Sequence, residues 1–348
     1  MNYKKKIYQI LFTPLIFFSA LIILYLIFPK IFFFRGWEFF ETYVYKQNKK
    51  LSFQIKVSGD SSRDYIFQKY KSKNKITINK YGNRVACYDS QKKNSVLVLG
   101  DSQTFGAGMS DSETLPKLLC NKFKNTSIYN GARKHTISLT KGKNFNFNKI
   151  LFMSSERVGF RKYCNTTSLK EYVIKDFDDD FFTLKKLNYL KFLKYQIKYL
   201  NSYLQSRSEA ILNPNNSFFS PNEYILMARH SYLGNVKFQE LDCIKKLDRL
   251  FESNNYQVAF IYYPSKQTVL YKKLKINLND ETINFIPKMT KMMTEQNITT
   301  MDSKKCINNR SHNNDIKIFE PHDTHLNYNG TNILFHCLIK SEIKSLFN

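Results

Sequence analysis

The sequence predicts an α/β fold, a three-layer α/β/α doubly wound parallel sheet with a helical insertion, preceded by one N-terminal transmembrane helix. From residue 95 onward, short apolar runs alternate with segments of helical periodicity. A charge-free apolar stretch lies near the N-terminus. The 348 residues are 43% hydrophobic and 16% aromatic. That composition supplies enough apolar side chain for a packed core and excludes a disordered chain.

The first 29 residues predict a membrane anchor. Residues 4–6 are Lys-Lys-Lys, and no charged residue occurs in 7–29. As a helix this stretch spans about 34 Å, which is enough to cross a bilayer. No A-x-A cleavage site follows, which favours an uncleaved signal anchor over a cleaved signal peptide. The positive-inside rule then predicts a single-pass protein in which 1–6 form a cytoplasmic tail, 7–29 cross the membrane and 30–348 are extracytoplasmic.

The chain is strongly basic. It has 54 Lys and Arg against 28 Asp and Glu, a formal net charge of +26. The lysines are scattered along the chain, which favours a compositional bias over a dedicated anion-binding stripe. Outside the cytoplasm no nucleic-acid partner is expected. Anionic lipid head groups and acidic envelope polymers remain as possible partners.

Six cysteines in an oxidising compartment permit disulfides, although spacing alone leaves their pairing open. They are Cys87, Cys120, Cys164, Cys243, Cys306 and Cys337. Cys120 and Cys337 fall in apolar helical patterns, so buried thiols are the alternative for these two. No C-x-x-C occurs, which gives no support to a zinc ribbon or a thioredoxin-type site.

Residues 30–94 have no clear period and predict a juxtamembrane segment, whereas 95–348 predict the globular domain. Four short apolar runs are expected to form buried strands. These strands are 95–100, 127–131, 149–153 and 257–263. Leucines at helical spacing predict a helix over 112–124 with Ser112 as its N-cap. A closing helix is expected over 329–347.

Residues 176–255 interrupt the alternation and predict a helical insertion. Aromatic side chains recur there at three- and four-residue spacing. They are Tyr189, Phe192, Tyr195, Tyr199 and Tyr203. Such a stripe is more often a core-facing surface than a ligand surface, so we expect it to face a core.

The first motif that could carry chemistry follows the predicted strand 95–100. It reads Gly100-Asp101-Ser102 and continues to Gly106 and Gly108. In doubly wound sheets, ligands bind beyond the carboxyl ends of the strands. A Ser at this turn exposes its hydroxyl beside its own backbone N–H, which suits a nucleophile with a built-in oxyanion donor. Asp101 is expected to hold the turn. An ordinary strand-to-helix turn is the alternative.

The second motif is near the C-terminus. Asp323 and His325 lie two residues apart, and a serine nucleophile needs a base that a carboxylate holds in the correct tautomer. His322 and His325 could instead form a metal pair. That alternative lacks a third partner at ligand spacing, so no metal is expected.

Together the two motifs resemble the SGNH (GDSL) hydrolase superfamily. Upstream, Ile78-Asn79-x-x-Gly82 looks like a segment that precedes the catalytic strand, and Tyr129-Asn130-Gly131-Ala132 falls at the second family block. The resemblance implies a triad of Ser102, His325 and Asp323 that needs no cofactor. It also implies that the N–H groups of Ser102 and Gly131 form the oxyanion hole.

The sequence departs from this pattern at the third family block, where an Asn usually donates to the oxyanion. Here Ser154-Ser155-Glu156-Arg157 follows the strand, so either Arg157 supplies the third donor or it pairs with Glu156. Pro264-Ser265-Lys266, followed by Tyr271, is similar to the branch related to alginate O-acetyltransferases. Members of that branch are often membrane-anchored and modify envelope polysaccharides.

The expected function is a membrane-anchored esterase or O-acyltransferase that works through a Ser102 acyl-enzyme on an extracytoplasmic glycan. Its partners would be an acylated or acyl-accepting envelope glycan and a membrane-bound acyl donor. One alternative is a catalytically silent glycan-binding or assembly protein with the same fold. Another is a phospholipid esterase drawn to the membrane by positive charge.

Overall fold

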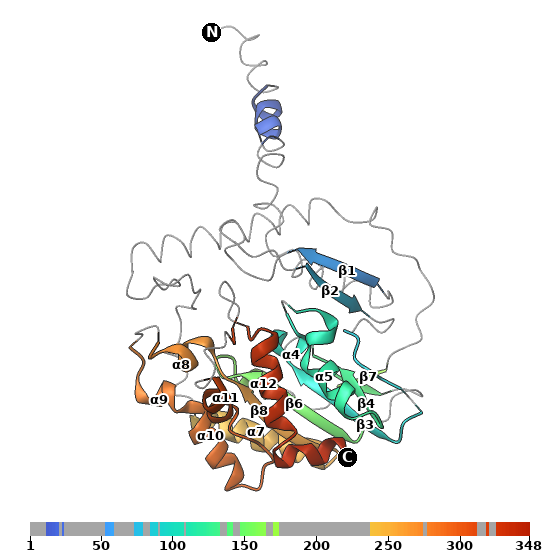
Figure 1. Ribbon diagram of the computed structural model, residues 1–348, viewed down its shortest axis with the longest axis vertical. Helices are drawn as coiled ribbons and strands as arrows, with labels where there is room; N and C mark the ends of the chain where they lie inside the picture. Colours follow the sequence, from blue (N-terminus) through green and yellow to red (C-terminus); the bar gives the residue numbers. More distant parts are fainter. Residues whose placement is uncertain are drawn as a thin grey trace.

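The structure is a computed structural model, and Figure 1 shows a parallel sheet between layers of helices. It describes residues 12–20, 23, 53–58, 73–78, 84–89, 91–107, 109–132, 138–141, 147–164, 170–173, 237–273, 277–311, 318–319 and 325–348.

The central sheet has four strands in the order β4-β3-β6-β8, all parallel. The strands are β3 (Asn94–Gly100), β4 (Thr126–Asn130), β6 (Lys149–Ser155) and β8 (Gln257–Tyr263). All four predicted strands are therefore confirmed, with ends that differ by no more than two residues. Because β3 is the first of the four in sequence and lies between the second and third, the connections diverge from its carboxyl end. Ligands bind at such a switch point in parallel sheets.

Helices cover both faces of this sheet, which confirms the predicted three layers. On one face lie α7 (Lys237–Glu252) and α10 (Phe285–Thr294). The other face holds α5 (Leu115–Lys122), α11 (Ser303–Ser311), α12 (Tyr328–Leu338) and the 3₁₀ helix η7 (Glu342–Phe347).

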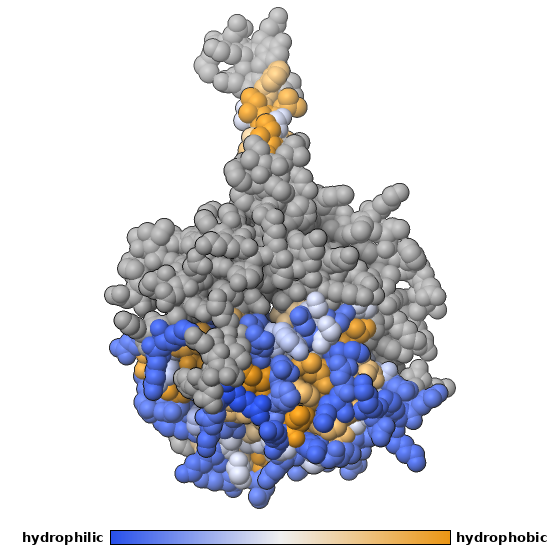
Figure 2. Space-filling view, viewed as in Figure 1, coloured by the Kyte–Doolittle hydropathy of each residue, from blue (hydrophilic) through white to orange (hydrophobic). Residues whose placement is uncertain are grey.

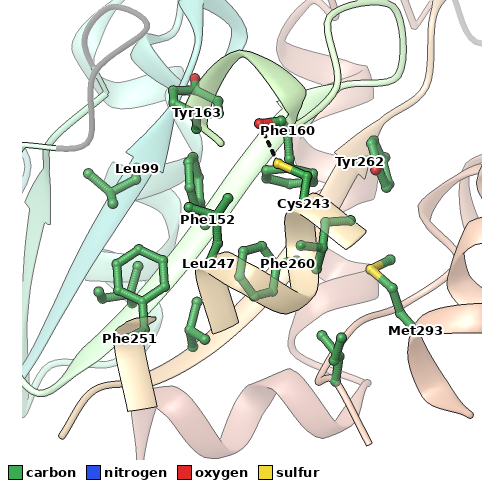
Figure 3. Close-up of a cluster of buried hydrophobic side chains, with 14 of the residues drawn as sticks. Leu99, Phe152, Phe160, Tyr163, Cys243, Leu247, Phe251, Phe260, Tyr262 and Met293 are labelled. Atoms are coloured by element: carbon green, nitrogen blue, oxygen red, sulfur yellow. Dashed lines mark hydrogen bonds between the residues drawn. The ribbon is translucent and has the colours of Figure 1, made fainter. Parts of the chain in front are cut away.

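Side chains of β3 alternate between the two cores. Val96 and Val98 pack towards α5 and α12, whereas Leu97 and Leu99 pack towards α7. The core under α7 is rich in aromatic rings, and Figure 3 shows Phe152 and Phe260 meeting there. The ring centroids of Phe152 and Phe260 are 5.9 Å apart. Strands buried on both faces explain why the middle of most of these runs is apolar in the sequence.

Helix α7 falls within the stretch predicted as an insertion, 176–255. It packs on the central sheet and contributes Ile244, Leu247 and Phe251 to the core. This helix is thus an integral layer of the fold. The aromatic stripe over 189–203 lies outside the described residues.

Two helix predictions need correction. The single closing helix expected over 329–347 is two elements, because α12 ends at Leu338 and η7 begins only at Glu342. Ser341 is extended between them, and its hydroxyl donates to the carbonyl of Leu338, a local bond that competes with helix continuation. The N-cap of α5 is Thr114 rather than Ser112, since Pro116 suits the first turn of a helix that begins at Leu115.

The remaining elements are short. β1 (Phe53–Ser58) pairs antiparallel with β2 (Lys73–Ile78), and β5 (Ser138–Lys141) pairs parallel with β7 (Lys170–Val173). The short helices are α4 (Ser102–Phe105), η3 (Asp111–Glu113), η4 (Arg161–Tyr163), α8 (Lys266–Leu270) and α9 (Asp280–Ile283).

All six cysteines form disulfides. The pairs are Cys87–Cys120, Cys164–Cys243 and Cys306–Cys337, with Cα–Cα distances of 5.8, 5.3 and 6.2 Å. The alternative of buried thiols at Cys120 and Cys337 is therefore wrong. Each bridge ties a helix to a segment packed beside it, and such a bridge restricts the unfolded chain.

Residues 12–20 are helical and lie inside the stretch predicted to span the membrane. Their large apolar side chains are more than half exposed, and Figure 2 shows them as a hydrophobic band apart from the sheet domain. Within the ranges that the structure describes, no helix reaches the length and apolarity needed to cross a membrane. Most of the other residues of 7–29 lie outside those ranges.

Candidate active site

The turn that follows β3 positions Ser102 at the carboxyl edge of the sheet. Asp101 caps the one-turn helix α4, because its Oδ1 accepts the N–H of Gln103 at 3.0 Å. Its Oδ2 accepts the N–H of Ser155 at 2.9 Å, which ties the turn to the end of β6. These bonds confirm that Asp101 holds the turn. Ser102 is therefore the first residue of a helix fixed to two neighbouring strands.

Gly106 ends α4 in a conformation that only glycine adopts readily. Its φ is +85°, and its N–H donates to the carbonyls of Ser102 and Gln103. A Cβ there would lie 2.4 Å from Cγ2 of Thr114. Gly106 is thus needed to close the helix within four residues.

Ser102 and His325 meet in the structure, although 223 residues separate them along the chain. Ser102 Oγ lies 2.8 Å from Nε2 of His325, within hydrogen-bond reach of a general base. Both side chains are partly exposed, so a substrate can reach the pair. The two sequence motifs are thereby brought to one place. Asp323 and His322 lie outside the described residues.

Gln103 links the backbones of the two motifs and was missed by sequence reasoning. Its Oε1 accepts the N–H of Leu326 at 2.8 Å, and its Nε2 donates to the carbonyl of Leu326 at 3.5 Å. The residue after the nucleophile therefore holds the residue after the base. Only the position of Gln103 beside Ser102 in the motif could have drawn attention to it.

The start of α12 fixes the segment that carries His325. Asn327 caps this helix by accepting the N–H of Gly330 at 3.0 Å. Its own N–H donates to the carbonyl of Ile318 at 3.1 Å, and Leu326 forms a β-bridge with Phe319. His325 thus stands at the entry to a capped helix that packs on the sheet.

The oxyanion donors differ from the expectation. The N–H of Ser102 belongs to the first residue of α4 and has no acceptor among the described residues, as is usual for a first-turn donor. The N–H of Gly131 donates to the carbonyl of Val98 at 2.9 Å. The β3–β4 ladder therefore occupies this donor, and the role that the family resemblance assigns to Gly131 is corrected.

Arg157 follows β6 at the same edge of the sheet but does not bond to Glu156. Glu156 is fully buried, and its Oε1 accepts from the N–H of Ser265 at 2.8 Å and from the hydroxyl of Thr268. Its Oε2 has no hydrogen-bond partner among the described residues. Burial raises the pKa of Glu156, against the lowering effect of the Ser265 and Thr268 bonds and the Lys304 charge. The alternative in which Arg157 pairs with Glu156 is therefore wrong.

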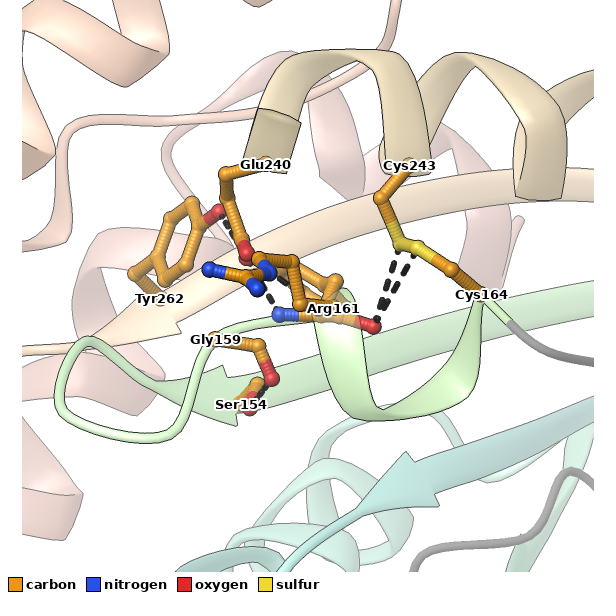
Figure 4. Close-up of a disulfide and its surroundings, with 8 residues drawn as sticks. Ser154, Gly159, Arg161, Cys164, Glu240, Cys243 and Tyr262 are labelled. Atoms are coloured by element: carbon orange, nitrogen blue, oxygen red, sulfur yellow. Dashed lines mark hydrogen bonds between the residues drawn. A yellow bond between two sulfur atoms is a disulfide. The ribbon is translucent and has the colours of Figure 1, made fainter. Parts of the chain in front are cut away.

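A second buried carboxylate anchors the loop beyond Arg157. Figure 4 shows Glu240 reaching from α7 to this loop beside the Cys164–Cys243 disulfide. The N–H groups of Phe160 and Arg161 donate to it, as does the hydroxyl of Tyr262 at 2.8 Å. Burial raises the pKa of Glu240, and these bonds oppose the rise. The loop after β6 is thus held from both sides, which fixes the backbone that carries Arg157.

Two buried tyrosines, Tyr163 and Tyr263, lie near the turn that carries Asp101. Burial raises the pKa of Tyr163 and of Tyr263 well above the ordinary tyrosine value, and the negative charge of Asp101 adds to the rise in both. Both phenols therefore stay neutral at physiological pH. Asp101 accepts two backbone N–H bonds, which stabilise a carboxylate at the turn before the nucleophile.

Likeness to known proteins is limited to structure. The sequence matches no protein-family model and no curated protein. A solved crystal structure from Veillonella parvula, described as a member of the lipolytic protein G-D-S-L family, is similar with a TM-score of 0.38 and 9% sequence identity. The likeness covers 72% of this chain and 98% of that chain. With a TM-score below 0.5, the argument for function depends on the residues of the site itself.

Proposed function

We propose that this protein is a serine-dependent acyl-ester hydrolase or O-acyltransferase of the SGNH type, anchored in a membrane and acting on an extracytoplasmic glycan. The observation that carries the proposal is the 2.8 Å contact between Ser102 Oγ and His325 Nε2 at the carboxyl edge of a parallel sheet. The contact joins a serine and a histidine that lie 223 residues apart in the sequence.

In the proposed reaction, Ser102 Oγ attacks the carbonyl carbon of an acyl ester while His325 Nε2 takes the hydroxyl proton. Asp323 orients the imidazole. The N–H of Ser102 stabilises the oxyanion. The C–O bond to the leaving alcohol then breaks, His325 returns the proton to that alcohol, and an acyl-Ser102 ester remains.

In deacylation, a second nucleophile attacks the acyl-Ser102 ester through the same steps. His325 takes a proton from water or from a sugar hydroxyl, whose oxygen attacks the acyl carbon and releases Ser102. Water gives hydrolysis, and a sugar hydroxyl gives transfer. Arg157, on the loop fixed by Glu240, is a second oxyanion donor in this proposal, in place of the Asn of the third family block.

The choice of a glycan substrate follows from the proposed compartment. Three disulfides fit an oxidising environment. The exposed apolar side chains of helix 12–20 fit insertion into lipid. The resemblance of Pro264-Ser265-Lys266 and Tyr271 to a branch that modifies envelope polysaccharides adds to this choice, with a membrane-bound partner as acyl donor.

The test uses the full-length protein in detergent with p-nitrophenyl acetate. We expect a burst of p-nitrophenol and an acetyl adduct on Ser102 by mass spectrometry. Ser102→Ala should lose both, whereas Ser253→Ala, an exposed serine after α7, should keep both. Acetylated oligosaccharides and acceptor oligosaccharides then separate hydrolysis from transfer.

Equal rates for the wild type and Ser102→Ala would overturn the proposal for acetyl esters. Longer acyl p-nitrophenyl esters would then decide whether another acyl group is used. If none of these esters labels Ser102, the serine mechanism is rejected. Fatty-acid release from sugar-free phospholipid vesicles would replace the glycan with a lipid substrate.

A further inference from the structure

Arg84 lies upstream of the sheet domain, in the stretch 30–94 that the sequence predicts as a juxtamembrane segment. It is only 1% exposed, which is unusual for an arginine. A buried guanidinium needs several hydrogen-bond acceptors to offset its lost hydration. The identity of those acceptors shows what this residue does.

The guanidinium of Arg84 contacts the backbone that follows the nucleophile. Its Nη1 donates to the carbonyl of Phe105 at 3.1 Å and to that of Gly106 at 2.5 Å. Its Nη2 donates to the carbonyl of Met109 at 2.5 Å. Its Nε bonds to Oδ1 of Asp111 at 3.0 Å. One side chain thus bridges the C-terminal end of α4 to the loop that runs to η3.

These acceptors include the carbonyls that a helix leaves unpaired at its C-terminus. A cation is favoured there, and a planar guanidinium can bond several carbonyls at once. The ring of Phe105 also lies under the guanidinium, 5.3 Å from its central carbon. Because α4 has only four residues, a fixed C-terminal end also fixes Ser102 at its start.

The same cluster joins the upstream segment to the site. Oδ1 of Asp111 also accepts the N–H of Thr77 in β2 at 3.1 Å, and the N–H of Val85 donates to the carbonyl of Thr77 at 3.0 Å. The Cys87–Cys120 disulfide and the bond from the N–H of Cys87 to the carbonyl of Ile128 hold the segment on the sheet. Residues 84–87 are therefore packed as part of the domain.

We infer that Arg84 is a positioning residue, which holds α4 so that Ser102 Oγ stays within reach of His325. Asp101 fixes the start of this helix, and Arg84 fixes its end. The upstream segment then belongs to the catalytic unit. This inference rests on the proposed function for its kinetic readout but not for its structural one.

The test compares Arg84→Met and Arg84→Lys with the wild type as full-length proteins. Amide hydrogen exchange over residues 105–109 reports directly on the held loop. The rate at which a fluorophosphonate labels Ser102 reports on the Ser102–His325 pair, and kcat and KM are measured on p-nitrophenyl acetate. Leu247→Ala, in the core on the other face of the sheet, is the control for lost stability.

We expect Arg84→Met to speed exchange over 105–109 by about tenfold or more and to lower labelling and kcat by about 10- to 100-fold. KM should stay within about twofold. Arg84→Lys keeps the charge but not the planar guanidinium. Its exchange rate, labelling rate and kcat should therefore lie between those of the wild type and of Arg84→Met. Leu247→Ala should lower the melting temperature and leave the labelling rate and local exchange unchanged.

Two results would overturn the inference. One is an amide exchange rate over 105–109 that equals the wild-type rate in either folded Arg84 variant. The other is a Ser102 labelling rate equal to that of the wild type in a variant whose loop exchanges faster. The held loop would then not determine the position of Ser102. If the wild type itself fails to label, the serine mechanism fails, and accelerated exchange in the Arg84 variants still supports Arg84 as the residue that holds this loop. Should Arg84→Met not fold, Arg84→Lys carries the test.

Discussion

Gln103 and Leu326 bond to each other in both directions, directly beside the contact between the proposed nucleophile and base. The N–H of Leu326 donates to Gln103 Oε1 at 2.8 Å, and Gln103 Nε2 donates back to the Leu326 carbonyl at 3.5 Å. Both residues are buried, so the pair is shielded from water. One amide side chain thus links the two chain segments directly.

Replacing Gln103 with Met should lower kcat by about tenfold and leave KM within about twofold. The substitution keeps the apolar stem but leaves the N–H of Leu326 without its acceptor, which costs about 1–3 kcal/mol. Part of that cost appears as misplacement of His325. Gln296→Met, on the surface, is the control. A wild-type kcat in Gln103→Met would show that the pair serves stability alone.

His325→Asn should lower kcat by about 10³-fold or more, because the proton of Ser102 loses its acceptor. The melting temperature should change little, since His325 is partly exposed. His336→Asn, on the later part of α12, controls for loss of an imidazole. Ester turnover under single-turnover conditions measures the effect. Equal losses in both variants would contradict the assignment of His325.

Asp248→Asn should stabilise the protein above about pH 6. Burial, aided by the charge of Glu252, raises the pKa of Asp248 from 3.8 to about 6. Stability is therefore lost as the pH rises from the unfolded pKa through the folded one. A fully buried group would lose about 3 kcal/mol, but this side chain is half-buried and screened by solvent, so we expect about 1 kcal/mol.

Urea unfolding at about pH 8 and about pH 4 checks this prediction. The gain from Asp248→Asn should be present at the higher pH and shrink towards zero at the lower one. Asp242→Asn, an exposed position of the same helix, is the control. A gain of equal size at both pH values would point to helix propensity rather than to the buried charge.

Replacing Cys87 and Cys120 together with Ser should lower the free energy of unfolding by about 3 kcal/mol. The bridge closes a loop with a sequence separation of 33 and ties the Arg84 segment to α5. Denaturant unfolding with and without reductant measures the effect. Under reductant the wild type should lose this advantage, and identical midpoints for both oxidised proteins would exclude the bridge as a source of stability.

The fold could be predicted well because each strand of the central sheet is buried on both faces. A run such as 258–263 is then continuously apolar or aromatic and stands out from its surroundings. The helix boundaries were less predictable. After Leu338 the chain turns, and both the N–H and the hydroxyl of Ser341 donate to the Leu338 carbonyl; such local bonds leave no trace in the apolar period.

The candidate site could be predicted as a pair of motifs but not as a connected structure. Ser102 and His325 carry recognisable chemistry, so their types and context identified them. Gln103 and Arg84 act through backbone atoms of other residues, and a backbone acceptor has no sequence signature. The N–H of Gly131 donates to a backbone carbonyl in the sheet ladder. That bond also has no sequence signature, so the sequence suggested this N–H as an oxyanion donor.

The separation of 223 residues between Ser102 and His325 has a consequence for biosynthesis. At about 5–20 residues per second, a ribosome completes His325 roughly 11–45 s after Ser102. During that interval the growing polypeptide carries a serine without its proton acceptor. Under the proposed mechanism, products of premature termination before residue 325 would lack the base, so esterase activity would begin only after this residue has been translated.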